Sequence, residues 1–153
     1  GIKWPNDILS GGGKLAGILV EMQSAGNGPA FTVAGIGLNV RMPSQDEKQL
    51  AAAIGRPWTD LDTELGDGPV VADRNQLVAW LLNEYTDPQR APRGRPAWAE
   101  RDVLRGNEIV LDCHKGQISG LAVGVDRDGG LLLQTANEGT RVFHSGEVSV
   151  RRD

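Results

Sequence analysis

The sequence predicts an α+β fold in which a portion of mixed strands and helices is followed by a small β-barrel. Three observations lead to this prediction. Short, partly β-branched apolar stretches occupy the first third, helical patterns occupy the middle, and brief strands at regular spacing begin near residue 106. We therefore expect two domains, over residues 1–104 and 105–153.

The first third contains two apolar stretches, residues 17–22 and 31–36, each of which has the length of a strand. Asn27-Gly28 lies between them, and this dipeptide favours a tight turn. An antiparallel hairpin is therefore expected.

Two capping boxes, in which a short polar residue is followed three positions later by Glu or Gln, lie in the middle of the chain. Ser44 with Glu47 forms the first, and Asp73 with Gln76 forms the second. Apolar side chains then recur on one helical face until Asp87, which precedes a proline. The expected helical segments are 45–54, Asp73 to Asp87, and a short piece at 97–104.

The last fifty residues alternate brief apolar stretches with turn residues, most clearly at 126–130, where the sequence reads Asp-Arg-Asp-Gly-Gly. Five short strands within so few residues are typical of a small barrel of the SH3-like type. The expected strands are 108–113, 117–125, 131–135, 140–144 and 147–151.

Composition limits the function further. The formal net charge of -4 argues against a nucleic-acid-binding surface, and no apolar run approaches the roughly 20 residues that span a bilayer. Cys113 is the single cysteine, so the chain cannot form an internal disulfide. We expect a cytoplasmic protein that binds neither nucleic acid nor membrane.

Two glycine-rich segments fail the standard tests for phosphate binding. The segment Gly11-Gly12-Gly13-Lys14 lacks the Ser or Thr that follows the lysine of a P-loop. The segment Gly35-Ile36-Gly37 lacks the third glycine of a dinucleotide fingerprint. Cys113 and His114 are neighbours in a strand, and their side chains point to opposite faces, so we expect no metal site there, with or without His144.

Polar side chains gather around the first turn and the glycine loop. Lys3, Asn6, Asp7 and Lys14 flank Pro5 and the glycines. Glycines within the apolar stretches let a ligand approach the backbone. The competing interpretation is a bulged sheet edge with solvated lysines.

Three ordered blocks carry a family resemblance: Lys-Trp-Pro-Asn-Asp at 3–7, Lys-Leu-Ala-Gly-Ile-Leu-Val-Glu at 14–21, and Gly-Ile-Gly-Leu-Asn-Val at 35–40. Together they resemble the blocks of biotin–protein ligases. Segments 73–77 and 146–151 are also similar, though less specifically, so the resemblance covers nearly the whole chain. It implies the C-terminal half of a biotin/lipoate-ligase-type catalytic domain followed by an SH3-like barrel.

The resemblance also implies an activity. Such an enzyme makes biotinyl-adenylate from biotin and ATP with Mg²⁺, then transfers biotin to a lysine of a biotin carboxyl carrier protein domain. Lys14 is expected against the biotin carboxylate and the α-phosphate, with Lys3 as a second cation. Asp7 is expected to orient or deprotonate the carrier amine.

The expected binding residues follow from the same comparison. Trp58 is expected to stack on adenine, although a half-buried packing role is the alternative. Arg151 is expected to reach the nucleotide from the tail, although a solvated terminal charge is the alternative. The biotin set is Lys14, Gly17, Leu19, Gly35 and Leu38, and the ATP set is Lys3, Asn6, Asn39, Trp58 and Arg151, with no protein-bound metal.

One feature of the family has no match here. An upstream glycine- and arginine-rich loop normally closes over biotin, whereas Arg93-Gly94-Arg95 lies downstream. The chain also starts at Gly1 within a motif, which favours a fragment over a processed terminus. We expect little adenylate formation and weak biotin binding from this chain alone. The alternatives are a non-catalytic carrier-docking or dimerisation module, including a homodimer, and a lipoate-type acyl ligase.

Overall fold

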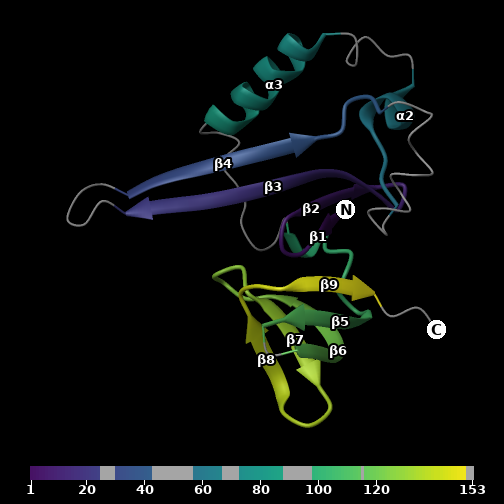
Figure 1. Ribbon diagram of the computed structural model, residues 1–153, viewed down its shortest axis with the longest axis vertical. Coiled ribbons are helices and arrows are strands. Elements are labelled where there is room, and N and C mark those ends of the chain that lie inside the picture. Colours follow the sequence, from purple (N-terminus) through teal and green to yellow (C-terminus); the bar gives the residue numbers. More distant parts are fainter. Residues whose placement is uncertain (25–29, 43–56, 67–72, 88–97, 115, 151–153) are drawn as a thin grey trace. The chain divides into compact units, whose positions relative to one another are not determined.

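The computed structural model describes residues 1–24, 30–42, 57–66, 73–87, 98–114 and 116–150 (Figure 1). The chain divides into two compact units. The terminal unit comprises Gly1–Pro5 and Pro88–Asp153, and the hairpin unit comprises Asn6–Asp87. The turn at residues 25–29 and the helix expected at 45–54 lie outside the described residues.

The hairpin unit is built on three antiparallel strands, β2 (Asp7–Ser10), β3 (Gly13–Ser24) and β4 (Ala30–Leu38). Figure 1 shows β3 and β4 as a long two-stranded ribbon. Their pairing runs from Ala16 opposite Leu38 to Ser24 opposite Ala30. The predicted antiparallel pairing of the two apolar stretches is confirmed, and both strands extend beyond the predicted limits.

A β-bulge interrupts the pairing of β2 with β3. Ile8 lies opposite Ala16, but Leu9 lies opposite Lys14, so Leu15 is an extra residue in β3. Side chains alternate between the two faces of a regular strand, and a bulge reverses that alternation on one side of it. Lys14 and Gly17 are three positions apart and would point to opposite faces of a regular strand. The bulge between them places both on the same face.

Within its described residues, the hairpin unit contains helices α2 (Leu61–Leu65) and α3 (Arg74–Thr86). The Asp73 carboxylate caps α3 by accepting hydrogen bonds from the backbone N–H groups of Asn75 and Gln76. The helix ends at Thr86, with Asp87 as its C-cap. The predicted cap at Asp73 and the helix end are therefore confirmed, the reciprocal contact from the Gln76 side chain stays a prediction, and α2 was not predicted.

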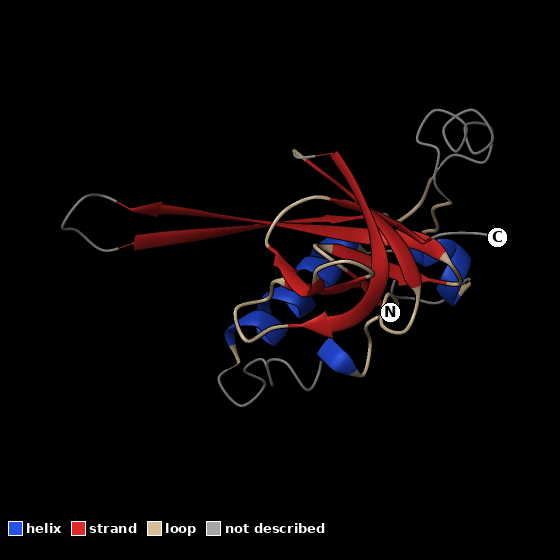
Figure 2. Cartoon of the chain, turned by 90° about the horizontal axis from the view of Figure 1, so that it is seen from below, coloured by secondary structure: helices blue, strands red, loops and turns tan. Residues whose placement is uncertain are grey.

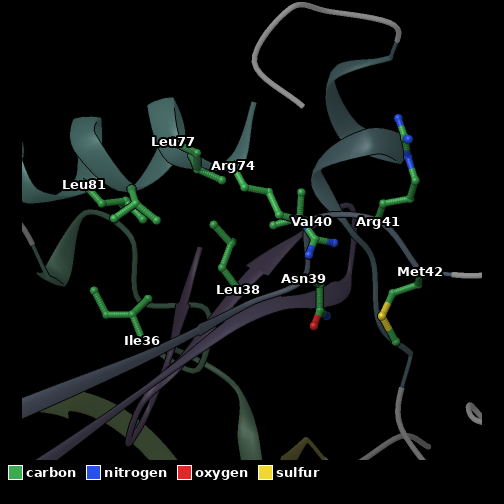
Figure 3. A pocket seen from close by; sticks show the side chains of 10 residues that line it. Ile36, Leu38, Asn39, Val40, Arg41, Met42, Arg74, Leu77 and Leu81 are labelled. Atoms are coloured by element: carbon green, nitrogen blue, oxygen red, sulfur yellow. The ribbon is translucent and has the colours of Figure 1, made fainter. Parts of the chain in front are cut away.

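Much of the apolar surface of the hairpin unit is exposed. The predicted apolar side of α3 carries Val78 and Tyr85, which are 54% and 74% exposed. A pocket of about 410 Å³ opens where β4 ends and α3 begins (Figure 3). The exposed apolar side chains of β3 and β4 are Leu19, Val20, Met22, Phe31, Val33 and Ile36.

The terminal unit contains a five-stranded antiparallel sheet in the order β8-β7-β6-β5-β9. Figure 2 draws its strands in red. The predicted strands are confirmed to within one residue where they are described. Among the described residues no pair joins β8 to β9, so the closed barrel stays a prediction, as does the domain boundary at 104. The strands are β5 (Glu108–Cys113), β6 (Gly116–Val125), β7 (Leu131–Thr135), β8 (Gly139–Phe143) and β9 (Glu147–Val150).

Trp4 lies in the core of the terminal unit. The short strand β1 (Ile2–Lys3) forms a parallel bridge with Asp102, which brings the start of the chain into this unit. The Trp4 side chain is 3% exposed, and its Nε1–H donates to the Gly129 carbonyl at 2.9 Å. Its buried companions are Leu104, Ile109, Leu111, Ala122, Leu131, Leu133 and Val148. In the part of the chain that the structure describes, no helix is long and apolar enough to cross a membrane.

Candidate functional site

An ion pair between Lys14 and Asp7 forms the centre of the candidate site. Lys14 Nζ lies 2.6 Å from Asp7 Oδ1. The Asp7 side chain is only 9% exposed, whereas the Lys14 side chain is 43% exposed. The lysine therefore keeps an accessible face and can donate hydrogen bonds to an anionic ligand while it still contacts Asp7.

The β-bulge at Leu15 brings this pair onto the glycine-rich face of β3 and β4. A side chain added at Gly17 would start 3.3 Å from Lys14 Nζ and 3.8 Å from Asp7 Oδ1. Gly17 pairs with Gly37, and Leu19 pairs with Gly35, so these four residues share one face. The structure thus brings together most of the residues that the sequence predicted around biotin.

The glycines of β4 leave open space on that face. A Cβ at Gly35 or Gly37 would have its nearest neighbour at 3.8 Å, the carbonyl oxygen of Leu19 or Gly17 respectively, which is ordinary contact. Neither glycine has a positive φ. Because glycine weakens a strand, and neither backbone geometry nor packing within the described residues requires it here, the space is suited to a ligand.

The segment Pro57-Trp58-Thr59 holds the backbone of Lys14. The Lys14 N–H donates to the Pro57 carbonyl at 3.0 Å, and the Lys14 carbonyl accepts from the Thr59 N–H at 3.0 Å. A Cβ at Gly13 would lie 2.7 Å from the Trp58 carbonyl carbon, so only glycine permits this close approach. Trp58 is half-buried and forms a parallel β-bridge with Lys14.

Asn39 is held in one orientation by two backbone carbonyls. Its Nδ2 donates at 3.0 Å to the carbonyl of Lys14 and at 3.0 Å to that of Thr59. Only the NH₂ group of the amide can satisfy two acceptors, which fixes the assignment of oxygen and nitrogen. The side-chain oxygen remains available to accept a hydrogen bond from a ligand.

Three carboxylates surround the N-terminus of α2 and its first turn. Burial alone would raise the pKa of Asp60. Hydrogen bonds from the Thr63 and Met42 backbone N–H groups outweigh that effect, with help from the Thr63 hydroxyl and the Arg41 charge, and lower this pKa. Hydrogen bonds from Ser10 and then Thr59 lower the pKa of Glu64. Arg41 donates two hydrogen bonds to Asp62, both at 2.9 Å.

Asp60 is expected to make the stability of the hairpin unit depend on acid pH. A carboxylate whose folded-state pKa is lowered stabilises the fold above its unfolded pKa, and this contribution is lost as the pH falls through the folded value. Asp60→Asn should therefore unfold at a lower temperature than the wild type near neutral pH, and the two should converge below about pH 4. Thermal unfolding followed by circular dichroism across this range checks the expectation. A gap that stays constant with pH would contradict it.

The remaining predicted residues are placed as follows. Asn6 is half-buried, and its backbone carbonyl accepts from Ile18 N–H at 2.9 Å. Leu38 pairs with Ala16 on the face opposite Leu19 and lines the pocket beside α3 (Figure 3), so the two leucines are not brought together. Lys3 is half-buried in the terminal unit, and Arg151 lies outside the described residues.

The sequence pattern did not point to Thr59, Asp60 and Glu64, which are the residues that connect α2 to Lys14. Asp60 followed by Leu-Asp-Thr-Glu has the composition of a capped first turn, with acidic residues near the helix N-terminus. That signal could have located α2. A helix of five residues has too few turns for a periodic pattern, and the long-range contacts of Glu64 leave no trace in the sequence.

Comparison with known families gives consistent matches at both ends of the chain. Residues 1–39 match the family described as "Biotin/lipoate A/B protein ligase family", and residues 108–151 match "Biotin protein ligase C terminal domain". A biotin–[acetyl-CoA-carboxylase] ligase from Mycobacterium tuberculosis is 32% identical, with 97% of this chain and 52% of that protein aligned. The chain belongs to the biotin–protein ligase family.

Further relatives agree with this assignment. The bifunctional ligase/repressor BirA of Escherichia coli is 30% identical over 98% of this chain and 46% of its own length. The apo structure of the Aquifex aeolicus biotin protein ligase matches with a TM-score of 0.67 and 27% identity, covering 99% of this chain and 65% of that one. The Aquifex aeolicus ligase in complex with biotin and ATP matches with a TM-score of 0.61 and 25% identity, covering 99% and 62%. The chain spans about half the length of the curated relatives it matches.

Proposed function

We propose that this chain carries the face of a biotin–protein ligase on which biotin and ATP react, and that the reaction is biotinyl-adenylate formation followed by transfer to a carrier-protein lysine. The observation that carries the proposal is the half-exposed Lys14, ion-paired with a buried Asp7, at the edge of an open glycine face. A fixed cation next to a surface with few side chains suits a ring system that lies against the sheet and carries an alkyl chain ending in a carboxylate.

The first step joins a biotin carboxylate oxygen to the α-phosphorus of ATP and releases pyrophosphate. Both reactants are anionic, so their approach requires positive charge that is already in place. Lys14 is proposed to contact the biotin carboxylate and the α-phosphate. Lysine is a compact point charge, and its three donors can serve the ligand and Asp7 at the same time.

In the second step, the carrier amine attacks the acyl carbon of the adenylate and AMP leaves. The amine is protonated at neutral pH and must lose a proton before it attacks. Asp7 is proposed to accept or orient that proton, because its carboxylate lies beside the cation that holds the acyl-phosphate. AMP leaves with the electron pair of the bond between the acyl carbon and the phosphate oxygen.

The nucleotide is proposed to bind beside Trp58 and Asn39. Because both donors of the Asn39 amide are used by backbone carbonyls, its oxygen presents an acceptor, which matches the exocyclic amine of adenine. Trp58 offers an indole face for stacking. Asn6, Lys3 and Arg151 remain proposed contacts on the basis of the family resemblance alone.

Biotin is proposed to lie over Gly17, Leu19 and Gly35. Leu38 occupies the opposite face of the sheet and is left out of this set. Mg²⁺ is proposed to arrive with ATP. Among the described residues no three His, Cys, Asp or Glu side chains form a metal site, and Mg²⁺ bound to nucleotides is held largely by phosphates and water.

The wider proposals rest on the relatives. We propose a biotin carboxyl carrier protein domain as the acceptor, a cytoplasmic location, the SH3-like barrel and the 1–104 and 105–153 domains. A homodimer, or a docking module without catalysis, is the second candidate function, and the exposed apolar side chains of β3 and β4 favour it. A lipoate-type ligase is less consistent with relatives that are named as biotin ligases.

Gly35→Val is expected to weaken ligand binding without weakening the fold. Valine favours strands, and its Cβ would lie 3.8 Å from the nearest atom, so the free energy of unfolding should stay within about 0.5 kcal/mol of wild type. The side chain would fill the proposed biotin surface and should weaken binding of a non-hydrolysable biotinyl-adenylate analogue more than about 10-fold, or 1.4 kcal/mol. An NMR titration, which detects weak complexes, measures this affinity.

Ala34→Val is the matched control for Gly35→Val, because it adds bulk to the adjacent residue on the opposite face of β4. It should leave the affinity for the analogue unchanged. Equal binding by the wild type and Gly35→Val would remove the glycine face from the site. A wild-type chain that binds neither the analogue nor ATP, but does bind a carrier domain, would favour the docking module.

A further inference from the structure

The carboxylate of Glu64 joins two segments that lie far apart in the sequence. Its Oε1 accepts a hydrogen bond from the Thr59 hydroxyl at 2.7 Å, and its Oε2 accepts one from the Ser10 hydroxyl at 2.5 Å. Ser10 is the last residue of β2 and begins the glycine loop, whereas Thr59 follows Trp58. One side chain of α2 therefore holds both the loop and the Trp58 segment.

The glycine loop approaches Glu64 closely after Ser10. A Cβ at Gly11 would start 3.2 Å from Glu64 Oε1. The next residue, Gly12, leads into Gly13, whose close approach to the Trp58 carbonyl is described above. Glu64 thus contacts this loop at its start, and the Trp58 segment contacts it at its end.

Both segments meet at Lys14. The loop leads directly into Lys14, and the Thr59 N–H donates to the Lys14 carbonyl. That carbonyl also accepts from Asn39 Nδ2. The position of Lys14 is therefore determined by the two segments that Glu64 connects.

α2 is itself held by its surroundings and can serve as a fixed support. A helix of five residues is not stable alone, so its contacts must hold it. The N–H groups of Leu61 and Asp62 donate to the carbonyls of Asn39 and Val40 at 3.0 and 3.1 Å. Asp60 caps the helix and also accepts from Met42 N–H at 2.8 Å. The helix is anchored to the end of β4, and Glu64 projects from this anchor.

We propose that Glu64 is a positioning residue, which holds Lys14 and Trp58 in the geometry that the nucleotide and the acyl group require. It does not touch the ligand. It acts by fixing the Ser10 and Thr59 hydroxyls, and through them the glycine loop and the Trp58 segment. The inference rests on the proposed function for the ligand, but the geometric part can be measured without any ligand.

The test combines two readouts on Glu64→Ala. 5-Fluorotryptophan labelling gives each of the four tryptophans its own ¹⁹F resonance, and Trp58→Phe assigns that of Trp58. In Glu64→Ala, we expect the Trp58 resonance to shift or broaden while the other three stay unchanged, which also shows that the fold is retained. The affinity for ATP, measured by NMR titration, should fall about 3- to 10-fold, the loss that follows from one or two weakened contacts.

Two further variants separate positioning from general stability. Glu64→Gln can still accept from one hydroxyl and donate to the other, so it should restore the Trp58 resonance and keep the affinity within about two-fold of wild type. Asp62→Ala removes another carboxylate of α2, which is hydrogen-bonded to Arg41 rather than to Ser10 or Thr59, and it should leave both readouts unchanged.

The outcomes distinguish the positioning role of Glu64 from the proposed ligase function. If Glu64→Ala lowers the melting temperature but leaves the Trp58 resonance and the ATP affinity of wild type, the positioning role is wrong and the contact is only structural. If the wild-type chain binds no ATP, the proposed function fails. The Trp58 resonance of Glu64→Ala then still decides whether Glu64 fixes this segment.

Discussion

Trp4→Ala is expected to lower the free energy of unfolding of the terminal unit by about 3–5 kcal/mol, the range for deleting a large buried aromatic side chain. The indole is 3% exposed and packs among the buried leucine, isoleucine and valine side chains of β5, β7 and β9. Its removal leaves a cavity that a close-packed core fills only in part. Urea unfolding, with hydrogen exchange measured over β5 to β9, reports on this unit.

Trp80→Ala is the matched control for Trp4, because the same substitution is made on α3 at a side chain that is 45% exposed. A change within about 0.5 kcal/mol is expected there. Trp4→Phe should lose about 1–2 kcal/mol, since it keeps much of the packing but removes the donor to the Gly129 carbonyl. Equal effects of Trp4→Ala and Trp80→Ala would show that Trp4 does not contribute to the core.

Lys14→Ala is expected to cause the largest loss of ligand binding. It removes the cation that faces the proposed acyl-phosphate. A hydrogen bond to a charged group contributes about 1.5–3 kcal/mol, so the affinity for a biotinyl-adenylate analogue should fall about 10- to 150-fold. NMR titration at two salt concentrations measures this loss, which should be smaller at high salt because salt screens the charge.

The same substitution leaves the buried Asp7 carboxylate without its partner. Because Lys14 is 43% exposed, solvent screens the pair, and we expect a stability loss of about 1 kcal/mol rather than that of a fully buried pair. Asp7→Asn with Lys14→Ala should recover this stability without recovering ligand affinity. Lys14→Arg keeps the charge but not its compact shape and should bind with intermediate affinity. An affinity for the analogue that is unchanged in Lys14→Ala would exclude the proposed role of the lysine.

The block at residues 3–7 contains both a packing residue and a candidate site residue, and its sequence does not show which is which. Within the block at residues 3–7, Asp7 belongs to the candidate site, whereas Trp4 belongs to the core of the terminal unit. The resemblance located the block but could not tell a packing residue from a reacting one. Burial and hydrogen-bond partners make that distinction.

Leu38 and Asn39 show the same limit at the end of β4. The family resemblance implied that Leu38 lies beside biotin, but the strand register places it on the other face of the sheet from Gly35. The sequence placed Asn39 against the nucleotide, but it did not show that two backbone carbonyls take the amide donors and leave only the side-chain oxygen for a ligand. The face of Leu38 and the partners of Asn39 both depend on contacts with segments that are distant in the sequence.

The sequence by itself determined the local structure of this protein: the strands of the hairpin and of the terminal sheet, the cap of α3 at Asp73, and the family. These features depend on alternation, capping and turn residues within a few positions of one another, so they can be read along the chain. The tertiary structure alone decided that a bulge at Leu15 brings Lys14 over Gly17, that Trp4 is a core residue, and that Glu64 connects Ser10 to Thr59. Each of these depends on contacts between residues that are distant in sequence, or on the shift of one residue that exchanges the two faces of a strand.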